Sequence, residues 1–145
     1  MNWQDKLNKE GLRLTTPRRV VISVLEAAGV PLSPQTIHQR SLDADEEIGL
    51  VSVYRTLEML TDLGLGRRVH GHDACHGYVL ASPGHHHHLV CRNCSTAVEF
   101  NGMDDLSTLI DHIQEETGFL VDEHMLQFSG LCPQCRKRPP HHDQD

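Results

Sequence analysis

Apolar residues in the first third of the chain recur at helical spacing between glycine and proline stops. The pattern predicts a short helix over residues 3–10, and a second helix that starts at Thr16-Pro17 and ends at Gly29. A stripe repeating every three or four residues marks the buried face of the second helix: Val20, Val21, Val24, Leu25 and Ala28. Ser33-Pro34 repeats the cap and proline start, which predicts a third helix through residue 41.

A fourth helix is predicted within residues 49–64, and it has two distinct faces. The apolar face consists of Val53, Leu57, Leu60 and Leu63, and the opposite face of Ser52, Arg55, Met59 and Asp62, with Tyr54 on the flank. Three short helices, of which the last carries polar residues on the outward face of its first turns, are typical of a helix-turn-helix, whose recognition helix enters the major groove. Residues 66–70 and 77–80, joined by a turn, predict a β-hairpin wing. Alternatively, Tyr54 and Arg55 cover a solvated face, because small helical triads are common.

The second half of the chain follows Ser82-Pro83-Gly84, which predicts a hinge because a proline followed by a glycine interrupts regular structure. Strands are predicted over residues 85–91, 96–100, 119–121 and 124–129, and a helix over residues 104–117 that ends at Gly118. The buried face of this helix is expected to contain Leu106, Leu109, Ile110 and Ile113. The mixture of helices and strands indicates the α+β class.

Charged residues are divided unevenly between the two halves of the chain. The net charge of −7 argues against indiscriminate binding to nucleic acid. Residues 1–82 hold nine Lys and Arg against ten Asp and Glu, whereas residues 83–145 hold four against ten. Any DNA contact is therefore expected in the first half, through local placement of basic residues. No segment approaches the ~20 apolar residues of a membrane-spanning helix, so no membrane partner is expected.

Two Cys-x-x-Cys pairs supply the four thiolates of a tetrahedral structural zinc site: Cys91, Cys94, Cys132 and Cys135. Disulfides are the alternative, but the chain opens with no signal peptide, so a reducing cytoplasm is expected. With 38% hydrophobic and 4% aromatic residues among 145, two small domains would each have a thin core. A zinc site that joins distant segments would compensate for that.

Four consecutive histidines occupy residues 85–88. In a strand their side chains alternate, so His85 and His87 face one side while His86 and His88 face the other. Further candidate ligands for the second pair are Glu99 and the wing residues His70, His72, Cys75 and His76; those for the first pair are His124 and Asp104 or Asp105. These ligands favour zinc, and imidazole with carboxylate also suits iron(II), nickel or manganese. The alternative is a solvated histidine edge that titrates near pH ~6.5.

The chain resembles the ferric uptake regulator superfamily of bacterial metal-responsive repressors. The matching segments follow the family's order over nearly the whole chain: residues 14–18, 49–57, 85–94, 99–100 and 130–135. The resemblance implies an N-terminal winged-helix domain over residues 1–82, a hinge at 83–84 and a C-terminal α/β dimerisation and metal-binding domain over 85–135. Residues 136–145 are expected to form a disordered tail.

The resemblance also implies roles for individual residues. Structural zinc is expected on the four cysteines named above, a hinge sensing site on His86, His88 and Glu99, and a second metal site on His85, His87 and His124. Tyr54 and Arg55 match the recognition-helix contacts of the family, and Arg13 matches a basic residue that reaches the DNA backbone or minor groove. Together with Arg18 and Ser52 they form the candidate DNA-contacting set.

This sequence departs from the iron-type pattern at three ligand positions. The hinge carboxylate falls near Val79 or Leu80 and the histidine before the third helix near Pro31, none of which ligates a metal. We expect His70 or His72 together with Cys75 to fill these vacancies. The helix acid of the second site falls near Leu106 or Ser107, which leaves Asp104 or Asp105 as displaced substitutes. A cysteine in the hinge site resembles the zinc uptake regulators, so zinc is slightly favoured.

The function expected from these features is metal-dependent repression of metal-uptake genes, with no enzymatic activity. The expected partners are a second copy of the chain and a double-stranded operator with an inverted repeat, with no small organic substrate. The expected cofactors are structural Zn²⁺ and a regulatory Zn²⁺ or Fe²⁺, with Mn²⁺ or Ni²⁺ as further candidates. The alternatives are a peroxide-sensing iron-bound repressor of the same fold, a zinc hydrolase with Glu99 as its base, and a metal buffer protein.

Overall fold

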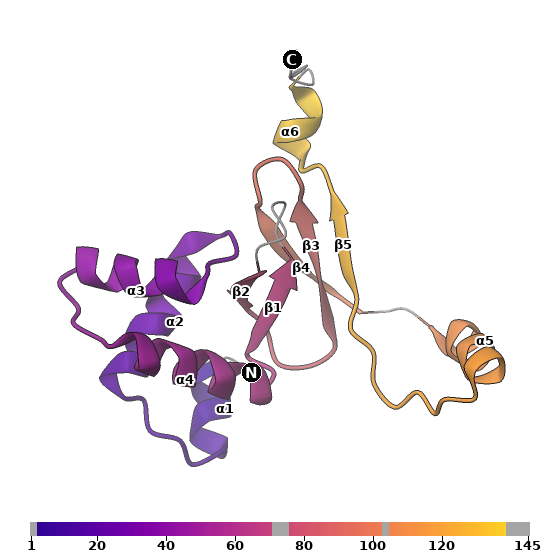
Figure 1. The fold of residues 1–145 in the computed structure, drawn as a ribbon, viewed down its shortest axis with the longest axis horizontal. Coiled ribbons are helices and arrows are strands. Elements are labelled where there is room, and N and C mark those ends of the chain that lie inside the picture. The colour runs from indigo at the N-terminus through magenta and orange to yellow at the C-terminus, as the bar shows by residue number, and fades with distance from the viewer. Residues whose placement is uncertain (1–2, 71–75, 103–104, 139–145) are drawn as a thin grey trace.

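The computed structural model describes residues 3–70, 76–102 and 105–138, and it has two parts (Figure 1). The first part consists of four helices and a hairpin: α1 (Trp3–Lys9), α2 (Thr16–Ala28), α3 (Pro34–Asp43), α4 (Leu50–Asp62), β1 (Gly66–His70) and β2 (His76–Leu80). The second part is a three-stranded sheet with two helices: β3 (His86–Cys91), β4 (Ala97–Asn101), α5 (Ser107–Thr117), β5 (Gln127–Gly130) and α6 (Pro133–Lys137). This is the predicted α+β winged-helix architecture.

The helical part encloses the larger hydrophobic core. Its fully buried members come from α2, α3 and α4 and from the start of the wing, and include Val21, Ile37, Val53, Leu60 and Leu65. Helix α3 begins where the sequence predicts, because the Ser33 side chain accepts a hydrogen bond from the Thr36 backbone N–H at 3.1 Å. The cap of α2 is Thr15 and not the predicted Thr16. Met59 also differs from expectation, since it packs partly buried against this core.

The wing lies directly against the helical part. Strands β1 and β2 pair antiparallel. Leu32, in the loop before α3, forms an isolated antiparallel bridge to Tyr78 of β2. Gly77 allows this approach, because a Cβ added there would lie 2.4 Å from the Cβ of Pro31. The loop before α3 and the wing therefore form one unit.

The sheet of the second part has β3 in the centre, antiparallel to β4 and parallel to β5. One face packs on the wing, where Val90 of β3 forms a small core with Val69 and Val79. The opposite face exposes apolar side chains that are neighbours in the register, namely Leu89, Val98 and Phe128. The described part of a single chain thus leaves one apolar sheet face uncovered.

Helix α5 corrects two predictions for residues 104–117. It begins at Ser107, and none of its residues is buried: Leu106 and Ile110 are half-buried, whereas Leu109 and Ile113 are exposed. The cause is visible in Figure 1, where α5 lies to one side of the sheet, away from the helical part. The helical spacing correctly identified an apolar face, but no other described segment of the chain covers it.

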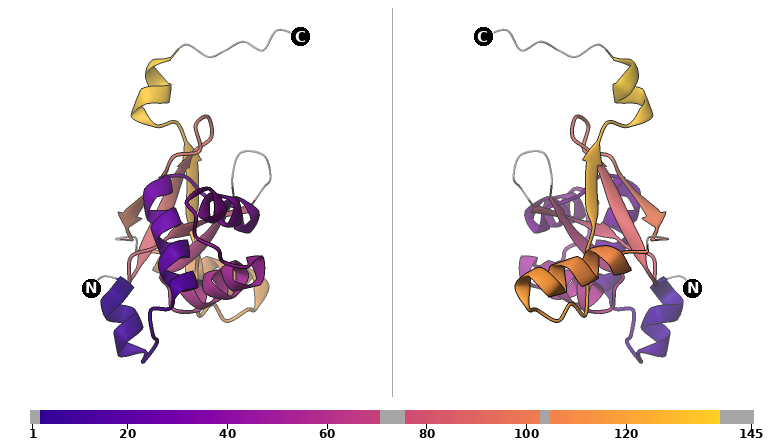
Figure 2. Two further views of the ribbon diagram at one scale, coloured as in Figure 1. Left: turned by 90° about the vertical axis from the view of Figure 1, so that its left-hand side faces the viewer. Right: turned by 90° about the vertical axis from the view of Figure 1, so that its right-hand side faces the viewer.

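The C-terminal segments differ from the predicted strands and tail. Residues 119–121 form no strand, and β5 starts at Gln127, so His124 lies in the irregular segment before it. Residues 136 and 137 belong to α6, which begins with Cys132 as its cap and Pro133 in its first turn, so the disordered tail is wrong for them. Helix α6 projects beyond one end of the sheet and α5 lies near the other (Figure 2). No helix among the described residues has the length and apolar character needed to cross a membrane.

Candidate metal centres

The four cysteines predicted to hold structural zinc come together at one end of the sheet. Cys91 ends β3, Cys94 follows it in a tight turn, and Cys132 and Cys135 flank the start of α6. Their four sulfur atoms all lie within 4.8 Å of one another. The Sγ atoms of Cys94 and Cys132 are 3.7 Å apart. A tetrahedral zinc with Zn–S bonds near 2.3 Å requires sulfurs about 3.8 Å apart, so the arrangement fits this ion.

Backbone and side-chain donors around these sulfurs favour thiolate at one side of the cluster. Amides of Cys94 and Cys132 donate to Cys91 and, together with the Asn93 amide, lower the pKa of Cys91 to about 6. The Asn93 side chain donates to the sulfur of Cys135 at 3.2 Å and lowers its pKa. The neighbouring thiols and burial outweigh that effect and raise the pKa of Cys135 to about 11. Zinc binds cysteine as thiolate, so the protons that remain on these thiols would leave when the metal binds.

A second cluster joins His85, His87 and His124. One ring nitrogen from each lies within 4.8 Å of the others, and the Nε2 atoms of His85 and His124 are 3.2 Å apart. Imidazoles on one tetrahedral zinc have nitrogens about 3.3 Å apart, so this pair also fits the ion. Asp105 does not join this set; its Oδ1 accepts a hydrogen bond from the Ser107 backbone N–H at 3.0 Å, and the Ser107 hydroxyl and amide lower its pKa. Asp104 lies outside the described residues.

Gly102 shapes this histidine cluster, although no local sequence pattern marks it as a functional residue. A Cβ added to Gly102 would lie 2.2 Å from Cδ2 and 2.7 Å from Nε2 of His85, and 2.9 Å from Nε2 of His87. Any side chain at this position would displace the two rings. The absence of a side chain at Gly102 therefore leaves the room that the His85 and His87 rings occupy.

We predict that Gly102→Ala weakens zinc binding by this cluster about tenfold or more, because the methyl group separates the rings that would share the ion. A competition titration with a chromophoric chelator, on protein whose cysteine cluster is already loaded, measures the change. Gly130→Ala is the matched control, because its added Cβ would be 3.9 Å from the nearest atom, in Leu89. Equal zinc affinity of the two variants would contradict the role given to Gly102.

His86 and His88 face the other side of β3, towards the wing. His88 is 2% exposed, its backbone partners are Glu99 on β4 and Gln127 on β5, and its ring donates to the Leu80 carbonyl. Burial and the nearby Arg67 guanidinium lower the pKa of His88, which keeps the ring neutral near pH 7. Among the described residues, Nδ1 of both His86 and His88 is buried without a hydrogen-bond partner. A neutral imidazole that donates a hydrogen bond through one nitrogen keeps a lone pair on the other nitrogen, and that lone pair can bind a metal.

Among the remaining hinge candidates that the structure describes, Glu99 lies beside His88 on the neighbouring strand, whereas His70 and His76 lie on the wing. Both carboxylate oxygens of Glu99 accept hydrogen bonds from Ser82, one from its N–H and one from its hydroxyl, each at 2.8 Å. His70 and His76 face each other across the hairpin with ring centroids 4.5 Å apart. Burial, Arg68 and His70 lower the pKa of His76. His72 and Cys75 lie outside the described residues, so their assignment stays a prediction.

A cavity of about 270 Å³ separates the helical part from the sheet beside these groups. Its walls include His88 and Glu99 from the sheet and Glu26 from α2. Glu26 accepts a hydrogen bond from the Trp3 indole at 2.8 Å. Space therefore remains next to the two sheet residues of the expected hinge site.

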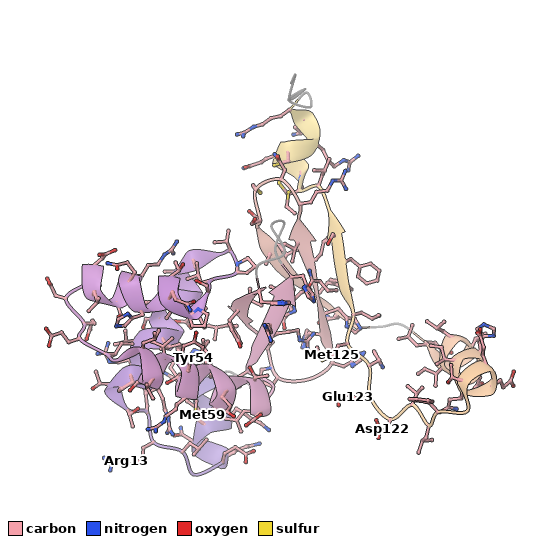
Figure 3. All side chains as sticks on the ribbon, in the orientation of Figure 1. Arg13, Tyr54, Met59, Asp122, Glu123 and Met125 are labelled. Carbon is pink, nitrogen blue, oxygen red and sulfur yellow. The ribbon has the colours of Figure 1, made fainter. Side chains whose placement is uncertain are left out.

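The candidate DNA-contacting residues lie on the helical part. Tyr54 is 45% exposed, and its hydroxyl accepts a hydrogen bond from the side-chain amide of Gln35, at 3.0 Å. Arg55 is exposed one residue further along α4, and Ser52 is half-buried. Arg18 donates to the backbone carbonyl of Arg13 at 2.6 Å, which fixes the segment that carries Arg13. Figure 3 shows Arg13 and Tyr54 on this part, and Asp122, Glu123 and Met125 on the segment between α5 and β5.

A winged helix joined to a sheet with four-thiol and histidine clusters defines a metal-binding regulator. The sequence matches the model of the Ferric uptake regulator family over residues 9–129. The ferric uptake regulation protein of Legionella pneumophila is 34% identical over 139 residues, which span 94% of this chain and 100% of that protein. The structure of the Vibrio cholerae ferric uptake regulator is 30% identical, with a TM-score of 0.55 over 89% of this chain and 98% of its own. A zinc uptake regulator solved with zinc and DNA is 20% identical, with a TM-score of 0.73 over 92% and 89%.

The chain therefore belongs to the ferric uptake regulator family of metal-binding, DNA-binding repressors. Members of this family are transcription regulators and not enzymes, which excludes the zinc hydrolase alternative. Regulators named for iron uptake resemble this chain in sequence, and the regulator named for zinc uptake resembles it in fold alone. The likeness alone thus leaves the sensed metal open.

Proposed function

We propose that the protein is a homodimeric, cytoplasmic repressor that binds an inverted-repeat operator of metal-uptake genes when the hinge site holds zinc. The observation that carries the proposal is the placement of His86 and His88. Both lie on the sheet face that packs against the wing, and both have a buried Nδ1 without a partner among the described residues. Ligands at this junction respond to the relative position of the DNA-binding and dimerisation parts.

The proposed mechanism is a population shift between arrangements of the two parts. His86 and His88 of the sheet, together with wing residues, would hold the ion, and ligands drawn from both parts would favour one arrangement when the ion is bound. His88 would bind through Nδ1 while its other nitrogen stays on the Leu80 carbonyl, at the end of β2. Moving a population from 1:99 to 99:1 takes roughly 5.5 kcal/mol of differential binding, which several direct ligands supply. The favoured arrangement would place two recognition helices about one DNA turn, ~34 Å, apart.

Uncovered apolar surface supports the homodimer. Leu109 on α5 is 51% exposed, and Phe119 and Leu120 just after it are 75% and 83% exposed. The outer face of the sheet adds Phe100 and Phe128, whose ring centroids are 5.9 Å apart. Apolar area of this kind in two separate places marks a protein–protein interface. A second copy would cover both.

The decisive experiment for the metal is a titration of operator binding at buffered free zinc and at buffered free iron(II). We expect zinc to tighten binding to an inverted-repeat operator. Tightening by iron(II) alone would overturn the choice of zinc.

Two alternative functions give different results. A metal buffer protein would show no metal-dependent change in operator binding. Oxidised histidine found by mass spectrometry after peroxide treatment would favour the peroxide-sensing alternative. If Cys75→Ser leaves zinc affinity unchanged, Cys75 is not a hinge ligand.

The contact between Gln35 and Tyr54 gives a prediction for DNA recognition. Tyr54→Phe is expected to weaken operator binding about tenfold, because it removes a hydroxyl that is already oriented. Gln35→Ala is expected to weaken it less, about threefold, since Gln35 acts through Tyr54. Fluorescence anisotropy on operator and scrambled DNA at one salt concentration measures both. Gln39→Ala is the matched control, because that amide bonds only to Asp43 of the same helix, at 3.0 Å, in the contacts described. An unchanged Tyr54→Phe affinity would remove Tyr54 from the recognition surface.

A further inference from the structure

Gln127, the first residue of β5, joins the sheet to the wing through both atoms of its side-chain amide. The backbone N–H of His70 donates to Oε1 of Gln127 at 3.0 Å, and Nε2 of Gln127 donates to the backbone carbonyl of His70 at 3.0 Å. The side chain thus satisfies both backbone groups of the last residue of β1, as a neighbouring strand would. We call this reciprocal pair the Gln127 clamp.

The clamp lies beside the candidate hinge ligands. Gln127 is the register partner of His88, and residues paired in a sheet share a face. From the same wing strand, Arg67 donates to the backbone carbonyl of His86 at 2.6 Å. Three hydrogen bonds therefore dock β1 across β3 and β5 at the level of the histidines. All three join protein groups only, so none of them requires a metal.

We propose that Gln127 is a positioning residue that holds the wing against the sheet and thereby sets the free metal concentration at which the repressor responds. The inference rests on the proposed function. A metal shared between sheet and wing ligands would favour the same docking that the clamp favours. The clamp thus contributes to the docked arrangement before any metal arrives.

Linkage gives the consequence for metal sensing. When only the docked arrangement binds metal, the apparent affinity is the intrinsic affinity reduced by the docked fraction. Where docking is the minor state, a tenfold loss of docking raises the metal concentration for half-maximal response tenfold. At saturating metal the docked state dominates again, so full operator affinity returns. A damaged ligand or a damaged DNA-binding surface would not give that recovery.

The test compares Gln127→Met with wild-type protein as full-length dimers carrying their cysteine-bound zinc. Methionine keeps the length of the side chain and removes both hydrogen bonds. The matched control is Gln114→Met, since Gln114 also bonds to backbone, accepting from the Val121 N–H at 2.9 Å, but within the sheet-side part alone. The measurements are operator affinity against buffered free zinc, and hydrogen exchange of the His70 amide.

We expect Gln127→Met to raise the zinc concentration at half-maximal operator binding about tenfold, and to speed His70 amide exchange by a similar factor. Operator affinity at saturating zinc should stay within about twofold of wild type, and Gln114→Met should change none of these. An unchanged zinc midpoint, or tighter operator binding without added zinc, would overturn the clamp. If operator binding by the wild-type protein does not change with added zinc, the proposed function itself fails. If the wild-type protein responds to zinc and Gln127→Met has the same zinc midpoint, only the role of the Gln127 clamp fails.

Discussion

Cys132→Ser is expected to lose the cysteine-bound zinc and to lower the unfolding midpoint by about 10 °C or more. The reason is that the hydrophobic core of this region is small, so little else stabilises its fold. Among the described residues, the hydrophobic core that includes the sheet consists of Val69, Val79 and Val90, with Ala97 packed against it. The cysteine cluster ties the end of β3 to the chain after β5, where the Arg92 amide also donates to the Gly130 carbonyl at 2.8 Å. Zinc binding at such a site stabilises the folded state of the segment between its ligands.

Metal analysis by mass spectrometry and a thermal melt followed by circular dichroism measure this effect. Ser129→Ala is the control, because Ser129 is an exposed residue of β5 three positions before Cys132. We expect that variant to keep the zinc bound by the four clustered cysteines and its melting midpoint. A Cys132→Ser protein with wild-type zinc content and an unchanged midpoint would show that the cluster has no structural role.

The helical part was predictable from the sequence because its signals are local. Ser33 caps α3, and the buried stripe that includes Val53 and Leu60 follows from helical spacing. The sequence also predicted α5 with the correct apolar face but placed that face in a core. Leu109 and Ile113 are exposed in the single chain because periodicity identifies which side is apolar and not which molecule covers it.

The four histidines at residues 85–88 also combine a feature that a local pattern predicted with features that depend on distant segments. Strand alternation predicted that His85 and His87 share a side, and the structure brings one nitrogen of each together with one of His124. His124 reaches them from irregular chain and not from the predicted strand, because β5 begins only at Gln127. The roles of Gly102, Gln35 and Gln127 depend on contacts between segments far apart in sequence. No local pattern marks such residues.

His88→Gln is expected to raise the metal concentration needed for operator binding at least about 100-fold. Loss of outer partners of a metal site costs 10- to 100-fold in affinity, and loss of a direct ligand costs more. His88 is also the hinge histidine with the most restrictive environment, because the residue is 2% exposed, its ring donates to the Leu80 carbonyl, and burial lowers its pKa. Glutamine keeps a hydrogen-bond donor for the Leu80 carbonyl but lacks the ring nitrogen Nδ1. The variant therefore tests metal binding by Nδ1 more than it disturbs packing.

Titration of operator binding with buffered zinc, together with metal analysis, separates this effect from unfolding. The variant should retain its cysteine-bound zinc, since Cys91 and its partners lie at the far end of β3. His112→Ala is the matched control, because His112 is an exposed histidine on α5 that pairs with Glu116 at 3.2 Å. It should respond to zinc like wild type. A His88→Gln protein with the wild-type zinc midpoint would mean that the sheet face against the wing does not sense metal, because no other described imidazole combines that burial with a carbonyl contact to β2.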